Sequence, residues 1–139
     1  MFEFVVNHPL LWMGALVVLV MLVKSEYEHH ANQAIQLNPM SAIRLINNNE
    51  KALIIDVRES SEFAKGHIKG ATNQPLTSLK DKISDLSKYK DSVVLAYCNS
   101  GTTSGKACRL LSQAGFSNVH NIAGGINGWL DAKLPITSK

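Results

Sequence analysis

The sequence predicts an α/β fold, with a small and mostly parallel sheet flanked by helices, preceded by one N-terminal transmembrane helix. Two observations lead to this prediction. From residue 37 onward, short continuous apolar runs alternate with segments of helical periodicity, as expected when parallel strands are buried on both faces. In addition, the first two dozen residues are almost uninterruptedly apolar.

The N-terminal segment, residues 4–23, has the length of a membrane span and contains only Asn7 and His8 as polar residues. Twenty helical residues extend about 30 Å, the thickness of one bilayer core. A signal peptide is less well supported because no Lys or Arg precedes the run. A core helix would need a polar stripe, which this run lacks. We therefore expect a transmembrane anchor over residues 1–24.

The charges around this segment predict its orientation. No basic residue precedes it, whereas Lys24 follows directly and Arg44 lies about twenty residues later. The positive-inside rule then places the large domain in the cytoplasm of a single-pass membrane protein. Residues 25–37 are polar and predict a juxtamembrane linker, into which the helix could continue for a turn or two. Adjacent imidazoles at His29–His30 point to different sides of a helix or strand, so we expect a solvated linker there rather than a metal site.

The domain is expected over residues 38–139, and its elements follow from local patterns. Asn38 and Pro39 form a cap-and-proline helix start. After it we expect a strand over 52–55, a short helix begun by Ser60 or Ser61 and ended by Gly66, a helix over 79–86, a strand over 92–97, a helix over 103–113 ended by Gly115, a strand over 118–122, a turn at Gly124–Gly125 and a last helix over 126–132.

Composition narrows the function classes. The net charge is +3, but no Lys/Arg block stands out, so nucleic acid is not an expected partner. The chain has two cysteines, Cys98 and Cys108, without a CxxC motif or a histidine at ligand spacing. Neither a disulfide framework nor a zinc site is therefore expected, and no metal or organic cofactor is predicted.

The most informative stretch is residues 92–111, where a buried strand ends on Cys98, Gly101 lies in a short loop and a helix begins near Thr103. Ligands of open α/β sheets bind outside the carboxyl ends of the strands. A helix N-terminus there offers free N–H groups, which would lower the pKa of a cysteine thiol. These residues alone indicate either a reactive cysteine or anion site, or a small buried hydrophobe at the end of a core strand.

Three separated segments resemble the rhodanese family. Residues 53–75 carry a D-x-R followed by E-F-x-x-G-H-I-x-G-A-x-N-x-P, residues 115–136 carry G-F-x-N-V-x-x-x-x-G-G-I-x-x-W, and the loop from Cys98 to Thr103 is similar to the six-residue active-site loop of that family. The resemblance covers residues 38–136. It implies a rhodanese-like fold without a metal or organic cofactor.

The resemblance also implies sulfane-sulfur transfer by a membrane-anchored sulfurtransferase. Cys98 would attack a donor such as thiosulfate, hold a persulfide and pass the outer sulfur to a thiophilic acceptor. Donor and acceptor would be small molecules or protein-bound groups, and a protein partner stays open. The residues implied to bind the anionic sulfur through their amides are Asn99, Ser100, Gly101, Thr102, Thr103 and Ser104.

The loop departs from many active relatives, which place an Arg where this chain has Thr103. The related phosphatases have a loop one residue longer that is closed by an Arg, so phosphatase activity is not expected. Asp56 and Arg58 are expected either to position the residues that contact the sulfur or to be structural. His67 and Trp129 are expected to serve packing. The alternative function is a non-catalytic binding or redox-sensing module at the membrane.

Overall fold

The computed structural model describes residues 2–31 and 35–139 and divides into two units, residues 1–33 and 34–139, each described here by itself. The first unit contains helix α1 (Phe2–Asn7) and helix α2 (Pro9–Ala31). Pro9 begins α2, as expected for a residue without a backbone N–H. Residues 9–27 of α2 are long and apolar enough to cross a membrane, by length and composition, and their side chains are exposed.

Within the predicted linker 25–37, the helix continues for about two turns, as the sequence allowed, and the last three residues form a strand that was not expected. Helix α2 continues through His29 and His30 to Ala31, and strand β1 (Ile35–Leu37) joins the sheet. The side chains of the two histidines and the whole of residues 32–34 lie outside the described part of the chain. The sheet domain therefore begins before residue 38.

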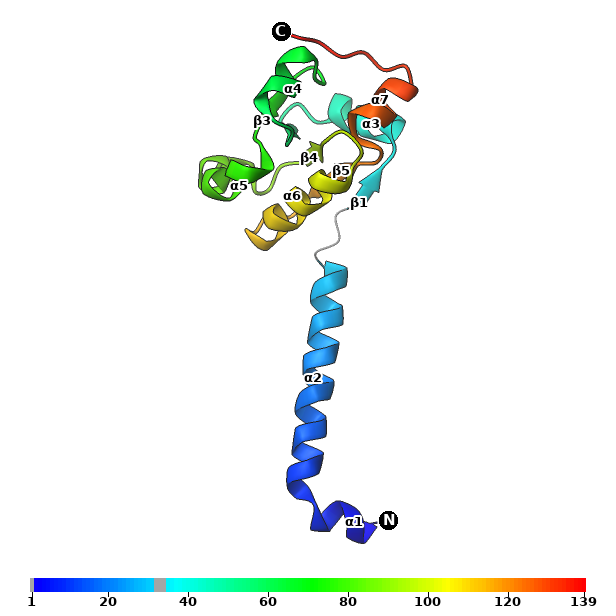
Figure 1. Ribbon diagram of the computed structural model, residues 1–139, viewed down its shortest axis with the longest axis vertical. Helices are drawn as coiled ribbons and strands as arrows, with labels where there is room; N and C mark the ends of the chain where they lie inside the picture. Colours follow the sequence, from blue (N-terminus) through cyan, green and yellow to red (C-terminus); the bar gives the residue numbers. More distant parts are fainter. Residues whose placement is uncertain (1, 32–34) are drawn as a thin grey trace. The chain divides into compact units, whose positions relative to one another are not determined.

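The second unit is built on one five-stranded parallel sheet with the strand order β1-β5-β4-β2-β3 (Figure 1). The other strands are β2 (Leu53–Asp56), β3 (Ala71–Asn73), β4 (Val94–Tyr97) and β5 (Val119–Ile122). Every residue of β2, β4 and β5 is buried. Burial on both faces explains the apolar runs at β2 and β4, whereas β5 also buries the polar residues His120 and Asn121. β1 and β3 are three-residue edge strands that the sequence pattern did not reveal.

Helices cover both faces of this sheet and enclose two hydrophobic clusters. The helices are α3 (Pro39–Asn48), α4 (Ser60–Lys65), α5 (Leu76–Lys82), the 3₁₀ helix η1 (Ile83–Tyr89), α6 (Thr102–Gln113) and α7 (Gly125–Asp131). Successive residues of β2 alternate between the clusters: Ile55 packs with Leu111 of α6, and Ile54 with Trp129 of α7.

Most element boundaries agree with the sequence prediction to within a few residues, and two elements differ from it. Asn38 caps α3 by accepting a hydrogen bond from the Ser41 amide at 2.8 Å, as its position predicted. Ser60, expected as a cap, is the first residue of α4, and Glu59 stands at the cap position without a side-chain bond. The single helix expected over 79–86 is α5 followed by the 3₁₀ helix η1.

Candidate active site

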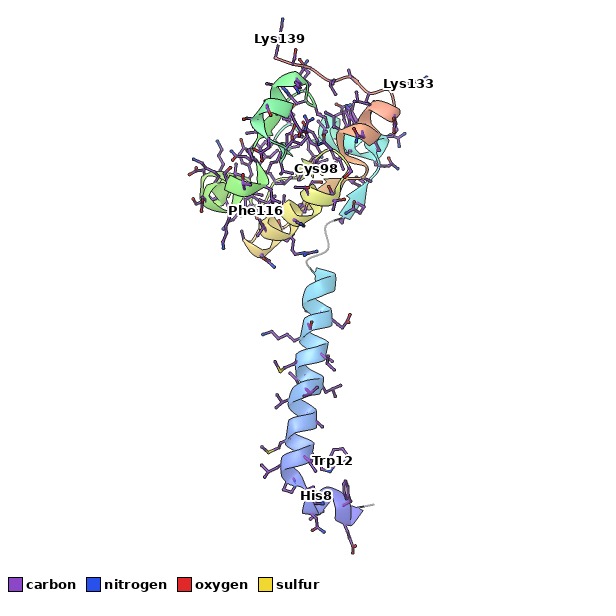
Figure 2. All side chains as sticks on the ribbon, viewed as in Figure 1. His8, Trp12, Cys98, Phe116, Lys133 and Lys139 are labelled. Carbon is purple, nitrogen blue, oxygen red and sulfur yellow. The ribbon has the colours of Figure 1, made fainter. Side chains whose placement is uncertain are left out.

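Cys98 lies directly after the central strand β4, and α6 begins four residues later at Thr102. Figure 2 labels Cys98 in the sheet domain. Gly101 between them has a φ of +97°, a left-handed conformation that favours glycine. This conformation turns the Gly101 amide toward the Cys98 sulfur, with N and Sγ 3.0 Å apart. The loop thus wraps its backbone around a sulfur that is almost fully buried.

The environment of Cys98 favours the thiolate. Burial by itself raises the pKa of the Cys98 thiol. The hydrogen bonds that the thiolate can accept, from the Ser104 hydroxyl and from the amides of Ser104, Gly101 and Ser100, outweigh it. The net result is a pKa below the ordinary thiol value. The arrangement fits a nucleophilic sulfur.

The six residues of the predicted sulfur-binding loop do not contribute equally. Ser104 is buried with its hydroxyl 3.4 Å from Cys98 Sγ. The side chains of Asn99, Ser100, Thr102 and Thr103 are exposed, so what the loop offers the sulfur is mainly backbone. No Lys or Arg occurs between Asn99 and Ser104. Lys106 in α6 is exposed.

The first turn of α7 holds the backbone of the cysteine loop in place. The amides of Ile126 and Asn127 donate to the carbonyls of Cys98 and Asn99 at 2.8 and 3.1 Å. Gly125 makes this approach possible, because a Cβ there would lie 2.3 Å from the Cys98 carbonyl oxygen. The sequence indicated only a turn at Gly124–Gly125, since nothing local shows that the turn packs on Cys98.

Asn121 on β5 is a second residue that sequence reasoning missed. It is buried, and its carboxamide Nδ2 donates to the Gly101 carbonyl at 2.9 Å and to Gln36 Oε1 of β1 at 3.2 Å. Its Oδ1 lies 2.6 Å from the Ser104 hydroxyl. The signal in the sequence was a polar residue within a buried strand, next to the apolar Ile122, and buried polar groups need partners.

Asp56 and Arg58 form a buried ion pair at the end of β2. Arg58 Nη2 lies 2.8 Å from Asp56 Oδ2 and donates to the Gly66 carbonyl at 2.6 Å, which joins the strand end to the end of α4. At the mouth of the loop, Asn99 Nδ2 donates to Glu62 Oε2 at 2.8 Å, and Glu62 lies 3.9 Å from Arg58. The pair therefore reaches the cysteine loop indirectly, through Glu62 and Asn99.

The other residues named in the sequence analysis, Cys108, His67 and Trp129, are buried in the packed interior. Cys108 is fully buried in α6, and burial raises the pKa of its thiol to about 12. The His67 ring stacks on Phe63 with centroids 3.8 Å apart. The buried Trp129 indole donates to the Pro135 carbonyl at 3.0 Å. Within the described residues, no cluster of three or more His, Cys, Asp and Glu side chains could hold a metal ion.

The domain is thus of the α/β class, with a parallel sheet and a buried cysteine in an amide-lined loop at the carboxyl end of the central strand. The model of the rhodanese-like domain matches residues 38–132 of this chain. The chain belongs to the rhodanese-like domain family.

Individual relatives support the same assignment. The chain is 30% identical over 135 residues to the uncharacterized protein YibN of Escherichia coli strain K12, covering 96% of this chain and 94% of YibN. It is 40% identical over 70 residues to the thiosulfate sulfurtransferase PspE of the same strain, covering 50% of this chain and 67% of PspE. The crystal structure of a rhodanese-related protein from Thermoplasma volcanium matches with a TM-score of 0.68 and 28% identity, covering 76% of this chain and 99% of that one. Sulfurtransferases thus occur among its homologues.

Proposed function

We propose that this protein is a membrane-anchored sulfurtransferase that moves sulfane sulfur from a donor such as thiosulfate to a thiophilic acceptor through a persulfide on Cys98. The observation that carries the proposal is the surroundings of Cys98 Sγ. The Gly101 amide lies 3.0 Å away, further loop amides point at the sulfur, and the pKa of the thiol is lowered despite burial. Family membership and a homologue named as a thiosulfate sulfurtransferase support the same chemistry.

The reaction consists of two displacements on sulfur. In the first, the Cys98 thiolate attacks the outer sulfur of thiosulfate, a new S–S bond forms, and sulfite leaves with the electron pair of the broken S–S bond. In the second, a thiophile attacks the outer sulfur of the persulfide, and the Cys98 thiolate leaves with the electron pair. The loop amides stabilise the anionic sulfur in both steps.

The charge of the loop bears on the donor. Thiosulfate is a dianion, and the loop offers it amides but no basic side chain. The Glu62 carboxylate bonded to Asn99 adds negative charge at the mouth, only partly offset by Arg58 at 3.9 Å. Thiosulfate should therefore react but bind weakly, and a less charged persulfide donor should bind better.

The test of this proposal is the mass of Cys98 after treatment with thiosulfate. We expect a gain of one sulfur atom on Cys98, and its loss together with formation of thiocyanate when cyanide is added. Cys98→Ser should abolish both. Cys108→Ala is the matched control, because this thiol is buried away from the loop amides; it should keep most of the activity and cost roughly 1 kcal/mol of stability.

Comparison with this control also shows which results would contradict sulfur transfer through Cys98. Transfer that persists in Cys98→Ser would remove the assignment, and equal loss from both substitutions would indicate a redox pair of cysteines. If Cys98 gains no sulfur from thiosulfate or from a small-molecule persulfide, the domain is a binding or redox-sensing module instead. The absence of basic side chains in the loop is the observation that favours this second function.

A further inference from the structure

The hydroxyl of Ser104 has two neighbours but only one hydrogen to donate. Its Oγ lies 2.6 Å from Asn121 Oδ1 and 3.4 Å from Cys98 Sγ, and all three residues are buried. The position of that hydrogen decides whether Ser104 stabilises charge on the sulfur. The geometry of Asn121 fixes where it lies.

The orientation of the Asn121 carboxamide follows from its neighbours. The Gly101 carbonyl oxygen can only accept a hydrogen bond, so the carboxamide atom 2.9 Å from it must be the donor Nδ2. Oδ1 then faces Ser104 and carries no hydrogen of its own. The Ser104 hydroxyl must therefore donate to Asn121, and it presents a lone pair to Cys98 Sγ.

This orientation suits a neutral sulfur and not an anionic one. A Cys98 thiol can donate its hydrogen to the Ser104 lone pair. A Cys98 thiolate has no hydrogen, and a lone pair directed at it is repulsive. Rotation about the Cβ–Oγ bond of Ser104 would direct the hydroxyl hydrogen to the thiolate, and Asn121 Oδ1 would lose the donor it has among the described residues.

We propose that Ser104 and Asn121 form a two-position hydrogen-bond switch, in which the Ser104 hydrogen bonds Asn121 while Cys98 Sγ is uncharged and turns to Sγ when it becomes a thiolate. The role of this switch in sulfur transfer rests on the proposed function. Sγ loses its charge when the persulfide forms and regains it when the outer sulfur leaves. Asn121 is thereby a positioning residue that acts through Ser104 and competes with the sulfur for one hydrogen.

Other ionisable groups near Cys98 do not determine which way the Ser104 hydrogen points. From α6, Cys108 faces Cys98 as a neutral thiol, because burial raises its pKa to about 12. From α4 and the end of β2, Glu62 and Arg58 lie together near the Asn99 side chain. The Gly101 peptide is also held without Asn121, since its carbonyl accepts from the Gly105 amide at 3.3 Å.

The experiment measures iodoacetamide alkylation of Cys98 against pH in the full-length protein, by mass spectrometry of tryptic peptides. Trypsin cuts after Lys106, between the two cysteines. Asn121→Leu keeps the approximate volume and shape but cannot accept the Ser104 hydrogen. At a pH below the pKa of Cys98, we expect Asn121→Leu to react about two- to tenfold faster, the range that one net hydrogen bond contributes to an equilibrium constant. Ser104→Ala should react more slowly than the parent chain.

The double variant separates the switch from a general loosening of the loop. In a Ser104→Ala background, Asn121→Leu should no longer accelerate alkylation, because no hydroxyl hydrogen is left to release. Asn118→Ala, an exposed asparagine just before the same strand, should leave the pH profile unchanged. Asn121→Ala serves as the second variant if the leucine is not accommodated, with the same expectation.

Slower or unchanged alkylation in a folded Asn121 variant would overturn the switch, and so would acceleration that persists without the Ser104 hydroxyl. Folding is checked by thermal unfolding. The experiment needs no sulfur donor, so it is independent of the test of sulfur transfer. Failure to form a persulfide would overturn the proposed function while leaving this result in place.

Discussion

At the scale of single residues, the two cysteines show how position changes the chemistry of one side chain. Cys98 and Cys108 are both buried. Cys98 faces loop amides and the Ser104 hydroxyl, whereas the Cys108 thiol donates to the His120 carbonyl at 3.5 Å. A carbonyl cannot stabilise a thiolate, so burial dominates at Cys108 and raises its pKa. Donors dominate at Cys98 and lower its pKa.

Glycine at position 125 is required by close packing on the loop. We expect Gly125→Ala to displace the Cys98 carbonyl, abolish persulfide formation and destabilise the fold by roughly 1–3 kcal/mol. Gly70→Ala is the matched control: Gly70 also has positive φ, but a Cβ there meets nothing within 4 Å. It should cost about 1–2 kcal/mol from backbone strain alone and leave persulfide formation intact. Equal losses of activity in the two variants, measured with urea unfolding alongside, would contradict this role.

At the scale of elements, the junction of β4 and α6 defines the shape of the site. Cys98 lies at the carboxyl end of the central strand β4. The helix α6 begins so soon afterwards that its first amides lie near the sulfur. Helix N-termini stabilise anions in this way. The cradle is therefore built for one small anionic group held by backbone.

The same junction predicts that the protein is not a phosphatase. A phosphoryl group needs a larger cradle and a bidentate arginine, whereas residues 99–104 carry no basic side chain and Arg109 lies well inside α6. We expect no phosphate release from an aryl phosphate above that of the Cys98→Ser variant. Release that disappears with Cys98→Ser would show that this reading of the loop is wrong.

At the scale of the whole molecule, the chain combines an apolar helix with a separate sheet domain. The apolar side chains of α2 that the structure describes are exposed. Helix α2 has the length and composition of a membrane span over residues 9–27, and a signal sequence shares both properties. Fractionation of the full-length protein separates the two.

We expect the sheet domain to lie in the cytoplasm, because Lys24 follows the apolar stretch and no basic residue precedes it. A reporter enzyme that is active only outside the cytoplasm, fused after Lys139, should be silent, and a cytoplasmic reporter at the same position should be active. The protein should stay in the membrane fraction at full mass. Recovery of a shortened soluble form would identify a signal sequence, and activity of the external reporter would reverse the orientation.

The fold class and the position of Cys98 could be predicted from local sequence patterns. Buried parallel strands must be apolar on both faces, so β2 and β4 appear as continuous apolar runs that any reader of the sequence can locate. The cysteine at the end of such a run, followed by Gly101 and a helix, is likewise a local pattern. The edge strands β1 and β3 were missed because three half-exposed residues have no pattern of their own.

The groups around the Cys98 sulfur, in contrast, could not be predicted without the three-dimensional arrangement of the strands and helices. Asn121 reaches Ser104 and Gly101 because β5 pairs with β4, and Gly125 meets Cys98 because α7 starts where that pairing ends. The link from Asn121 to Gln36 depends on β1 joining the same sheet. These residues lie far apart along the chain, and their chemistry arises from strand order and register, which are set by packing of the whole domain and not by local sequence.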